Sequence, residues 1–178
     1  PRYGVHEPMW GFVYEQTAIR AEGGRAEVPL AGLAQPRIEP EILFGLKAPP
    51  PRSHDPHAIL AAIDWVAHSI EIVQCFHPDW KVKLADCTAA NGLHGRLVIG
   101  PPTPVQDIAH LEALLPAARV VLRKDGKAVD EGVGANVLDS PLFALAHLVE
   151  ELAIQPDFQQ LHAGEIVSTG TLTDAHPV

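Results

Sequence analysis

The sequence predicts an α+β fold in which a mixed, mainly antiparallel β-sheet packs against a few helices. Turn signals join several β-rich segments, helical patterns are few and separated, and regular strand–helix alternation is absent. A hydrophobic content of 47% over 178 residues is enough for one core. We therefore expect a single domain over residues 1–178. The start at Pro1 and the stop at Val178 suggest that it is truncated at both ends.

The first third of the chain is predicted to be mainly β-structure. The aromatic run Met9–Val13 and the segment Val28–Leu30 flank a glycine turn, which indicates an antiparallel hairpin. Residues 38–46 then alternate in the manner of a strand. Because strand side chains alternate between faces, Glu39 and Glu41 should lie together on one face.

A helix is predicted between this strand and the next. Asp55-Pro56 resembles a helix start, and apolar residues recur at helical spacing as far as Ile70. The following segment, Ile70–Phe76, is rich in β-formers and includes Glu71. We expect it to form a strand close to the one that carries Glu39 and Glu41.

The second half combines two packing helices with a hairpin. Thr103-Pro104 and Ser140-Pro141 each precede a helical apolar pattern. Between them, a Lys-Asp-Gly-Lys turn joins two β-rich segments, of which the first is Arg119–Leu122. Two further strands are expected, at 135–138 and at 166–169.

Charge and composition exclude several classes of function. The net charge of −9, from 13 basic and 22 acidic residues without a basic cluster, argues against binding to nucleic acid or to anionic membranes. Cys75 and Cys87 form neither a CxxC motif nor a disulfide framework. The longest apolar run is interrupted by charged residues, so no membrane span is predicted. We expect a soluble, cytoplasmic protein with a small-molecule ligand.

Three carboxylates in apolar segments form the sharpest candidate site. Glu39, Glu41 and Glu71 would be costly to bury without a cation or several hydrogen-bond donors, and no Lys or Arg occurs at matching spacing on these segments. A divalent metal would satisfy them. The alternative is that Glu39 and Glu41 point outward from a half-exposed strand.

The order of the motifs resembles the fumarylacetoacetate hydrolase superfamily, in particular its branch of 2-keto-4-pentenoate hydratases and 4-oxalocrotonate decarboxylases. The resemblance covers nearly the whole chain. Its motifs are Gly4-Val5-His6-Glu7-Pro8, Pro36-Arg37-Ile38-Glu39-Pro40-Glu41-Ile42, Ile70-Glu71-Ile72-Val73, Asp79-Trp80-Lys81, residues 86–91, Gly132-Val133-Gly134-Ala135, residues 161–167 and Thr169-Gly170-Thr171. The resemblance implies the β-sheet roll of that superfamily.

It also implies a metal-dependent lyase. The metal ligands of the family fall on Glu39, Glu41 and Glu71, and hard oxygen donors suit Mg²⁺ or Mn²⁺. The implied reaction is that of a hydratase, which adds water to a 2-hydroxy-2,4-dienoate through a metal-stabilised enolate. Such enzymes belong to aromatic-compound catabolism.

Further residues are candidates for the site, and each has an alternative structural role. Lys81, Asp86 and Asn91 are candidate catalytic residues, against a surface role for the lysine and turn capping for the other two. His77 and His94 could be bases or solvated loop residues. The candidate substrate-binding residues are Trp10, Thr169 and Thr171, against core packing for the tryptophan and ordinary strand positions for the threonines.

Other functions stay open. The Asp-Ser-Arg run that usually follows the third glutamate in the family is replaced by Gln74-Cys75-Phe76, which suggests a different substrate. The alternatives are a 2-oxo-3-enedioate decarboxylase, an acylpyruvate C–C hydrolase that uses His6 and Glu7, and a non-catalytic partner subunit. The family also implies a homo-oligomer and association with a related decarboxylase or hydratase.

Overall fold

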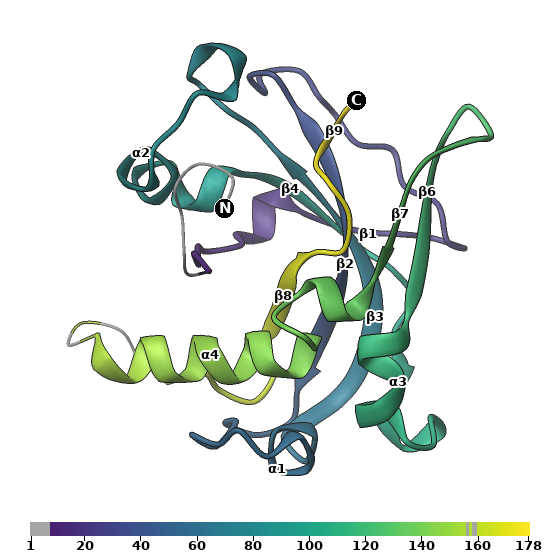
Figure 1. The fold of residues 1–178 in the computed structure, drawn as a ribbon, viewed down its shortest axis with the longest axis vertical. Helices are drawn as coiled ribbons and strands as arrows, with labels where there is room; N and C mark the ends of the chain where they lie inside the picture. The colour runs from purple at the N-terminus through teal and green to yellow at the C-terminus, as the bar shows by residue number, and fades with distance from the viewer. Residues whose placement is uncertain (1–7, 156, 158–159) are drawn as a thin grey trace.

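The computed structural model describes residues 8–155, 157 and 160–178. Its main sheet has seven strands, of which five follow the order β1-β4-β3-β2-β8, while β5 pairs with β3 and β9 pairs with β2 (Figure 1). These strands are β1 (Ala18–Arg20), β2 (Arg37–Leu46), β3 (Ile63–Val73), β4 (His94–Ile99), β5 (Thr103–Pro104), β8 (Ile166–Thr171) and β9 (His176–Pro177). Pairing is antiparallel except between β1 and β4, so the mixed, mainly antiparallel α+β architecture is confirmed.

Helices connect and cover these strands. The α-helices are α1 (Pro56–Leu60), α2 (Leu84–Ala89), α3 (Leu111–Ala117) and α4 (Pro141–Ile154). Short 3₁₀ turns are η2 (Glu15–Thr17), η3 (Pro78–Trp80), η4 (Asn91–Leu93), η5 (Val105–Asp107) and η6 (Gly134–Asn136). Of the described helices, none is long and apolar enough to cross a membrane.

The long antiparallel pair of β2 and β3 forms the centre of the molecule. The helix predicted as far as Ile70 is wrong, because α1 ends at Leu60 and β3 begins at Ile63. The apolar residues of this stretch fit helical spacing, but its β-branched side chains also suit a largely buried strand. Pairing with β2 and β4 satisfies its backbone groups, so the strand is formed.

The two faces of the sheet differ in what covers them. Helices α3 and α4 pack on one face, which we call the helix face, against side chains that include Phe44 and Val66 (Figure 1). The other face, which we call the carboxylate face, carries Leu43 together with Leu97 and Ile99 of β4. Alternation along the strands separates the two sets.

The N-terminal hairpin expected from the sequence is not formed. Residues 9–13 have no strand assignment, and neither has Val28–Leu30. The first described strand is β1, which runs parallel to β4. The side chain of Asn91 takes the place of a partner strand at Phe12. It accepts a hydrogen bond from the N–H of Phe12 and donates one to its carbonyl, each at 2.8 Å.

The second half agrees better with prediction. The hairpin of β6 (Arg119–Lys124) and β7 (Lys127–Val133), the helix α4 and the strand β8 are confirmed. The strand expected at 135–138 is wrong, because Gly134 packs against the carbonyl of Leu115 and the chain turns as η6. The helix expected from Thr103 begins only at Leu111, since Thr103–Pro104 pairs with β3.

Candidate metal centre

Strands β2 and β3 bring three glutamates together on the carboxylate face. Glu39 lies directly opposite Glu71, and Glu41 follows two residues later opposite Ser69. Residues directly opposite in an antiparallel pair, and residues two apart in one strand, point to the same side. One carboxylate oxygen of each glutamate lies within 4.8 Å of the other two. The predicted convergence of these three side chains is therefore observed.

The glutamates are shielded from water, so the outward-facing alternative does not hold. Glu41 is only 3% exposed, and the side chain of Glu71 is 19% exposed. Leu97 lies directly opposite Glu71 on β4, and Ile99 lies opposite Ser69. Both are buried on the same face, so the carboxylates lie in a largely apolar environment. Such an environment disfavours the ionised form.

The pKa values reflect this environment. Burial raises the pKa of Glu39 from 4.5 to about 7, and the charge of Glu71 adds to that rise, while Arg37 opposes it. Burial also holds the pKa of Glu41 well above its ordinary value, again with a contribution from Glu71. Three negative charges this close repel one another unless a cation or protons compensate them. The cluster therefore favours a bound cation or bound protons.

Glu41 is held by donors from β8. The hydroxyl of Ser168 donates to Oε2 of Glu41 at 2.5 Å, and the N–H of Gly170 donates to the same oxygen at 3.3 Å. The hydroxyls of Ser69 and Ser168 are 2.9 Å apart, so Ser69 donates in turn to Ser168. These bonds favour the ionised carboxylate, in opposition to burial.

Glu71 is held from β4. Nδ1 of His94 lies 2.6 Å from Oε1 of Glu71, and Nε2 of the same ring lies 2.8 Å from Oγ1 of Thr17. The side chain of His94 is 6% exposed, which contradicts a solvated loop histidine. The residues Thr17, His94 and Glu71 thus form one continuous hydrogen-bonded chain that ends at the carboxylate cluster.

The donor set fits a hard divalent cation. The expectation that no Lys or Arg occurs at matching spacing is wrong, because Arg37 is two residues before Glu39 in β2 and its charge lowers the pKa of Glu39. The guanidinium of Arg37 lies over the ring of Trp80, and among the described residues no Lys or Arg forms an ion pair with any of the three glutamates. Three carboxylates without a cysteine or a histidine among the converging donors are the ligand type that Mg²⁺ and Mn²⁺ prefer. Glu39, Glu41 and Glu71 would hold such an ion.

The candidate catalytic residues Lys81 and Asp86 make local contacts. The side chain of Lys81 is 82% exposed, and its Nζ lies 3.4 Å from Asp79. Asp86 accepts a hydrogen bond from the N–H of Lys83 at the start of α2, and its other oxygen lies 3.8 Å from Nε2 of the half-exposed His77. The structure does not bring either residue among the three carboxylates, and their catalytic roles stay predictions.

Trp10 lies in the N-terminal segment, and Asn91 bonds to that segment. Both polar atoms of the Asn91 side chain bond to the backbone of Phe12. Trp10 is half-buried, and its ring meets that of Phe12 edge-on, with centroids 5.6 Å apart. The predicted roles of Asn91 in catalysis and of Trp10 in substrate binding stay predictions. The residues His6 and Glu7 lie outside the described part of the chain.

The candidate substrate-binding threonines lie on β8. The hydroxyl of Thr169 donates to the carbonyl of Ile42, and that of Thr171 donates to the carbonyl of Thr173, each at 2.9 Å. Thr171 lies opposite Glu41, because the register of β8 shifts between Ser168 and Thr171. Substrate binding by the two threonines stays a prediction.

Sequence reasoning missed three polar residues around the carboxylate cluster, namely Ser69, Ser168 and Thr17. Ser69 could have been found, since it is two residues before Glu71 in the same strand. Ser168 could not be placed without knowing the register shift in β8. Thr17 is 77 residues from His94, and no local pattern connects them.

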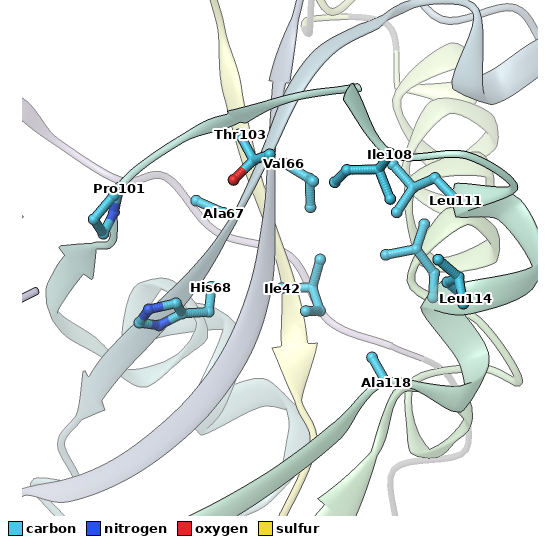
Figure 2. A pocket seen from close by; sticks show the side chains of 11 residues that line it. Ile42, Val66, Ala67, His68, Pro101, Thr103, Ile108, Leu111, Leu114 and Ala118 are labelled. Atoms are coloured by element: carbon cyan, nitrogen blue, oxygen red, sulfur yellow. The ribbon is translucent and has the colours of Figure 1, made fainter. Parts of the chain in front are cut away.

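An open hollow of about 300 Å³ lies elsewhere, between the helix face and α3. Figure 2 shows Ile42 and His68 at its sheet side and Leu111 and Leu114 at its helix side. Ile42 and His68 are directly opposite each other and alternate with Glu41 and Ser69 along their strands. The hollow therefore belongs to the side of the sheet opposite the carboxylates.

Several known proteins are similar to this chain in sequence and in fold. The chain is 36% identical over 178 residues to 2-hydroxyhexa-2,4-dienoate hydratase of Comamonas testosteroni, covering 97% of the chain and 63% of the relative. It is 32% identical to 4-oxalocrotonate decarboxylase of Pseudomonas sp. (strain CF600), covering 98% and 63%. The structure of 4-oxalocrotonate decarboxylase from Pseudomonas putida G7, complexed with magnesium and adipate, superposes with a TM-score of 0.85 at 30% identity, covering 99% and 64%.

The chain thus spans a little under two thirds of the length of these relatives. Their names include both a hydratase and a decarboxylase, which confirms the branch that the motifs indicated. The model of the family "Fumarylacetoacetate (FAA) hydrolase C-terminal" matches residues 2–177, nearly the whole chain. The chain belongs to the fumarylacetoacetate hydrolase family.

Proposed function

We propose that the protein is a hydro-lyase that binds Mg²⁺ or Mn²⁺ through Glu39, Glu41 and Glu71 and adds water to a 2-hydroxy-2,4-dienoate. The observation that carries the proposal is the convergence of three shielded carboxylates within 4.8 Å. Burial and mutual repulsion make this cluster unfavourable unless it is compensated. The similarity to a dienoate hydratase supports the reaction class.

Neighbouring residues orient and shield the proposed metal ligands. Ser168 and Gly170 bond to one oxygen of Glu41 and so fix the direction of this carboxylate. Leu97 and Ile99 limit the access of water, which strengthens electrostatic interactions in the site. A bound divalent ion supplies a Lewis acid that stabilises negative charge developing on the oxygens of a 2-oxo acid.

Decarboxylation of a 2-oxo-3-enedioate is the second candidate. It is supported by the similarity to 4-oxalocrotonate decarboxylases, one of which was solved with the dicarboxylate adipate. Both reactions use a 2-oxo acid at a metal. The difference between them lies in whether a second carboxylate leaves the substrate.

The assembly and the cellular location belong to the same proposal. We infer a homo-oligomer, with association with a related decarboxylase or hydratase as a further arrangement, and a cytoplasmic location. These inferences rest on membership of the family.

A product assay separates the candidates. The protein is incubated with 2-hydroxypenta-2,4-dienoate and, separately, with 2-oxo-3-hexenedioate, each with Mg²⁺ and with a chelator. We expect loss of the dienoate only with Mg²⁺, and no turnover by Glu41→Ala. The matched control is Glu131→Ala, because Glu131 is an exposed glutamate in the β6–β7 hairpin.

Each outcome has a distinct meaning. Release of CO₂ from the enedioate without hydration of the dienoate would favour the decarboxylase. Metal binding without turnover of either substrate would favour a non-catalytic partner subunit. Unchanged activity of Glu41→Ala would contradict the metal assignment.

A further inference from the structure

We propose that His94 is a positioning residue for Glu71 and that Thr17 holds His94 in the orientation this requires. The inference deepens the proposed function and rests on it, because it concerns one of the three proposed metal ligands. His94 touches neither substrate nor metal in this scheme. Its role is to fix the direction of the Glu71 carboxylate.

The contact between His94 and Glu71 is short and shielded. Nδ1 of the ring lies 2.6 Å from Oε1 of Glu71, and the imidazole is only 6% exposed. A glutamate side chain has three rotatable bonds, so an unrestrained carboxylate samples several directions. The bond from His94 holds one oxygen of Glu71 in place. Partners of this kind commonly orient the ligands of metal sites.

The hydrogen bonds of Thr17 fix which way the His94 ring faces. The hydroxyl of Thr17 donates its one hydrogen to the carbonyl of Tyr14 at 2.9 Å. Toward His94 it can therefore only accept, so Nε2 of the ring donates to Thr17 across 2.8 Å. With Nε2 donating in this way, Nδ1 faces Glu71, and the hydrogen bond between them needs a second proton, on Nδ1 or on the carboxyl group. A ring flip would break both bonds.

The backbone places Thr17 and His94 next to each other. The residues before His94, namely Asn91, Gly92 and Leu93, have φ angles of 54°, 69° and 67°. For Leu93 this conformation is strained, and its side chain is buried in a small core with Cys87, which offsets the strain. The turn thereby delivers His94 to the start of β4.

A second pair of bonds ties the N-terminal segment to this turn. The side chain of Asn91 bonds to both the N–H and the carbonyl of Phe12. Gly11 approaches the Asn91 carbonyl so closely that an added Cβ would lie 2.6 Å from it. The segment that carries Thr17 is thus fastened to the turn that carries His94. This preorganisation is what a positioning role requires.

Mn²⁺ affinity, measured by electron paramagnetic resonance or calorimetry on the whole chain, tests the proposal. We expect His94→Ala to weaken Mn²⁺ binding about 10- to 100-fold, the usual effect of removing a residue that orients a metal ligand. His94→Asn should recover part of the loss, since its side-chain amide can donate to Oε1 of Glu71 in place of the ring. Thermal stability is recorded in parallel, because a purely structural histidine would lower stability and leave affinity unchanged.

The Thr17 variants form the matched pair. Thr17→Ser retains the hydroxyl and should bind Mn²⁺ like the wild type, whereas Thr17→Val removes it and should bind more weakly. In the His94→Ala background, Thr17→Val should add no further loss of affinity, because the effect of Thr17 passes through His94. This pair also carries the test if His94→Ala fails to fold.

Two results would overturn the proposal. One is unchanged Mn²⁺ affinity in folded His94→Ala, and the other is an additive loss in the double variant. Failure of the underlying metal site looks different: in that case the wild type would not bind Mn²⁺ saturably, or Glu41→Gln would bind it as tightly as the wild type.

Discussion

The two faces of the β2–β3 pair use the same backbone for opposite purposes. On the helix face, Phe44 and Val66 pack against α3 and α4 in a continuous apolar core. On the carboxylate face, Glu39, Glu41 and Glu71 are shielded among apolar neighbours. Successive residues along each strand point alternately into the two environments.

The difference shows how stability and function are divided within one strand. Burial of apolar area on the helix face stabilises the fold. Burial of carboxylates on the other face destabilises it until protons or a cation compensate the charge. Replacing a side chain should therefore change the free energy of unfolding in opposite directions on the two faces.

The largest effect is expected on the helix face. Phe44 has no exposed surface, so Phe44→Ala should lower the free energy of unfolding by about 3–5 kcal/mol. Chemical denaturation of the metal-free protein measures this change. In contrast, Glu41→Gln should leave the stability of the metal-free protein unchanged or raise it. If the glutamine variant were destabilised as much as the alanine variant, the two faces would not differ as described.

The next effect concerns pH. Because the pKa of Glu39 rises from 4.5 to about 7 on folding, the folded state holds its proton more tightly than the unfolded state. The resulting stabilisation is present below about pH 4.5 and is lost as the pH rises through 7. Without metal, the protein should lose about 2–3 kcal/mol from this group between pH 5 and pH 8. Denaturation curves across this range measure the loss.

Two controls accompany the pH experiment. Glu39→Gln should flatten the decline, since glutamine does not titrate. Saturating Mg²⁺ should restore stability at pH 8, because a ligand that binds only the folded state stabilises it. A metal-free protein that becomes more stable from pH 5 to pH 8 would show that Glu39 is not shielded as the structure indicates.

A smaller effect is expected at Ser168. Its hydroxyl donates to Glu41, and Ser168→Ala should weaken Mg²⁺ binding about tenfold, which corresponds to about 1.4 kcal/mol. Ser69→Ala removes only the bond to Ser168 and should have a weaker effect. Calorimetry compares the two variants. An equal or larger loss in Ser69→Ala would mean that Ser168 is not the residue that orients Glu41.

The carboxylate cluster was predictable because it depends on strand alternation, which is a local property. Placing Glu39 and Glu41 together required only the two-residue period of one strand. Adding Glu71 required only the pairing of two strands. The start of β3 at Ile63 was not predictable, because the apolar residues before Glu71 fit both helical and strand spacing.

The residues that surround the cluster depend on long-range geometry instead. Ser168 reaches Glu41 through a register shift in β8, which no spacing in the sequence announces. His94 reaches Glu71 through a turn of three residues with positive φ, of which only Gly92 is a glycine. Such contacts are fixed by tertiary packing, so the sequence alone left His94 undecided between a base and a solvated residue.

Counting bound metal ions is the most direct test of the carboxylate cluster. Calorimetric titration of the chelator-treated protein with Mn²⁺ at pH 7.5 should give one saturable site per chain. Replacing Glu39, Glu41 or Glu71 singly by glutamine should weaken it at least 100-fold, beyond the range of about 10–100-fold typical for residues that only support a ligand. Absence of saturable binding, or the same affinity in all three variants as in the wild type, would contradict a metal centre at these glutamates.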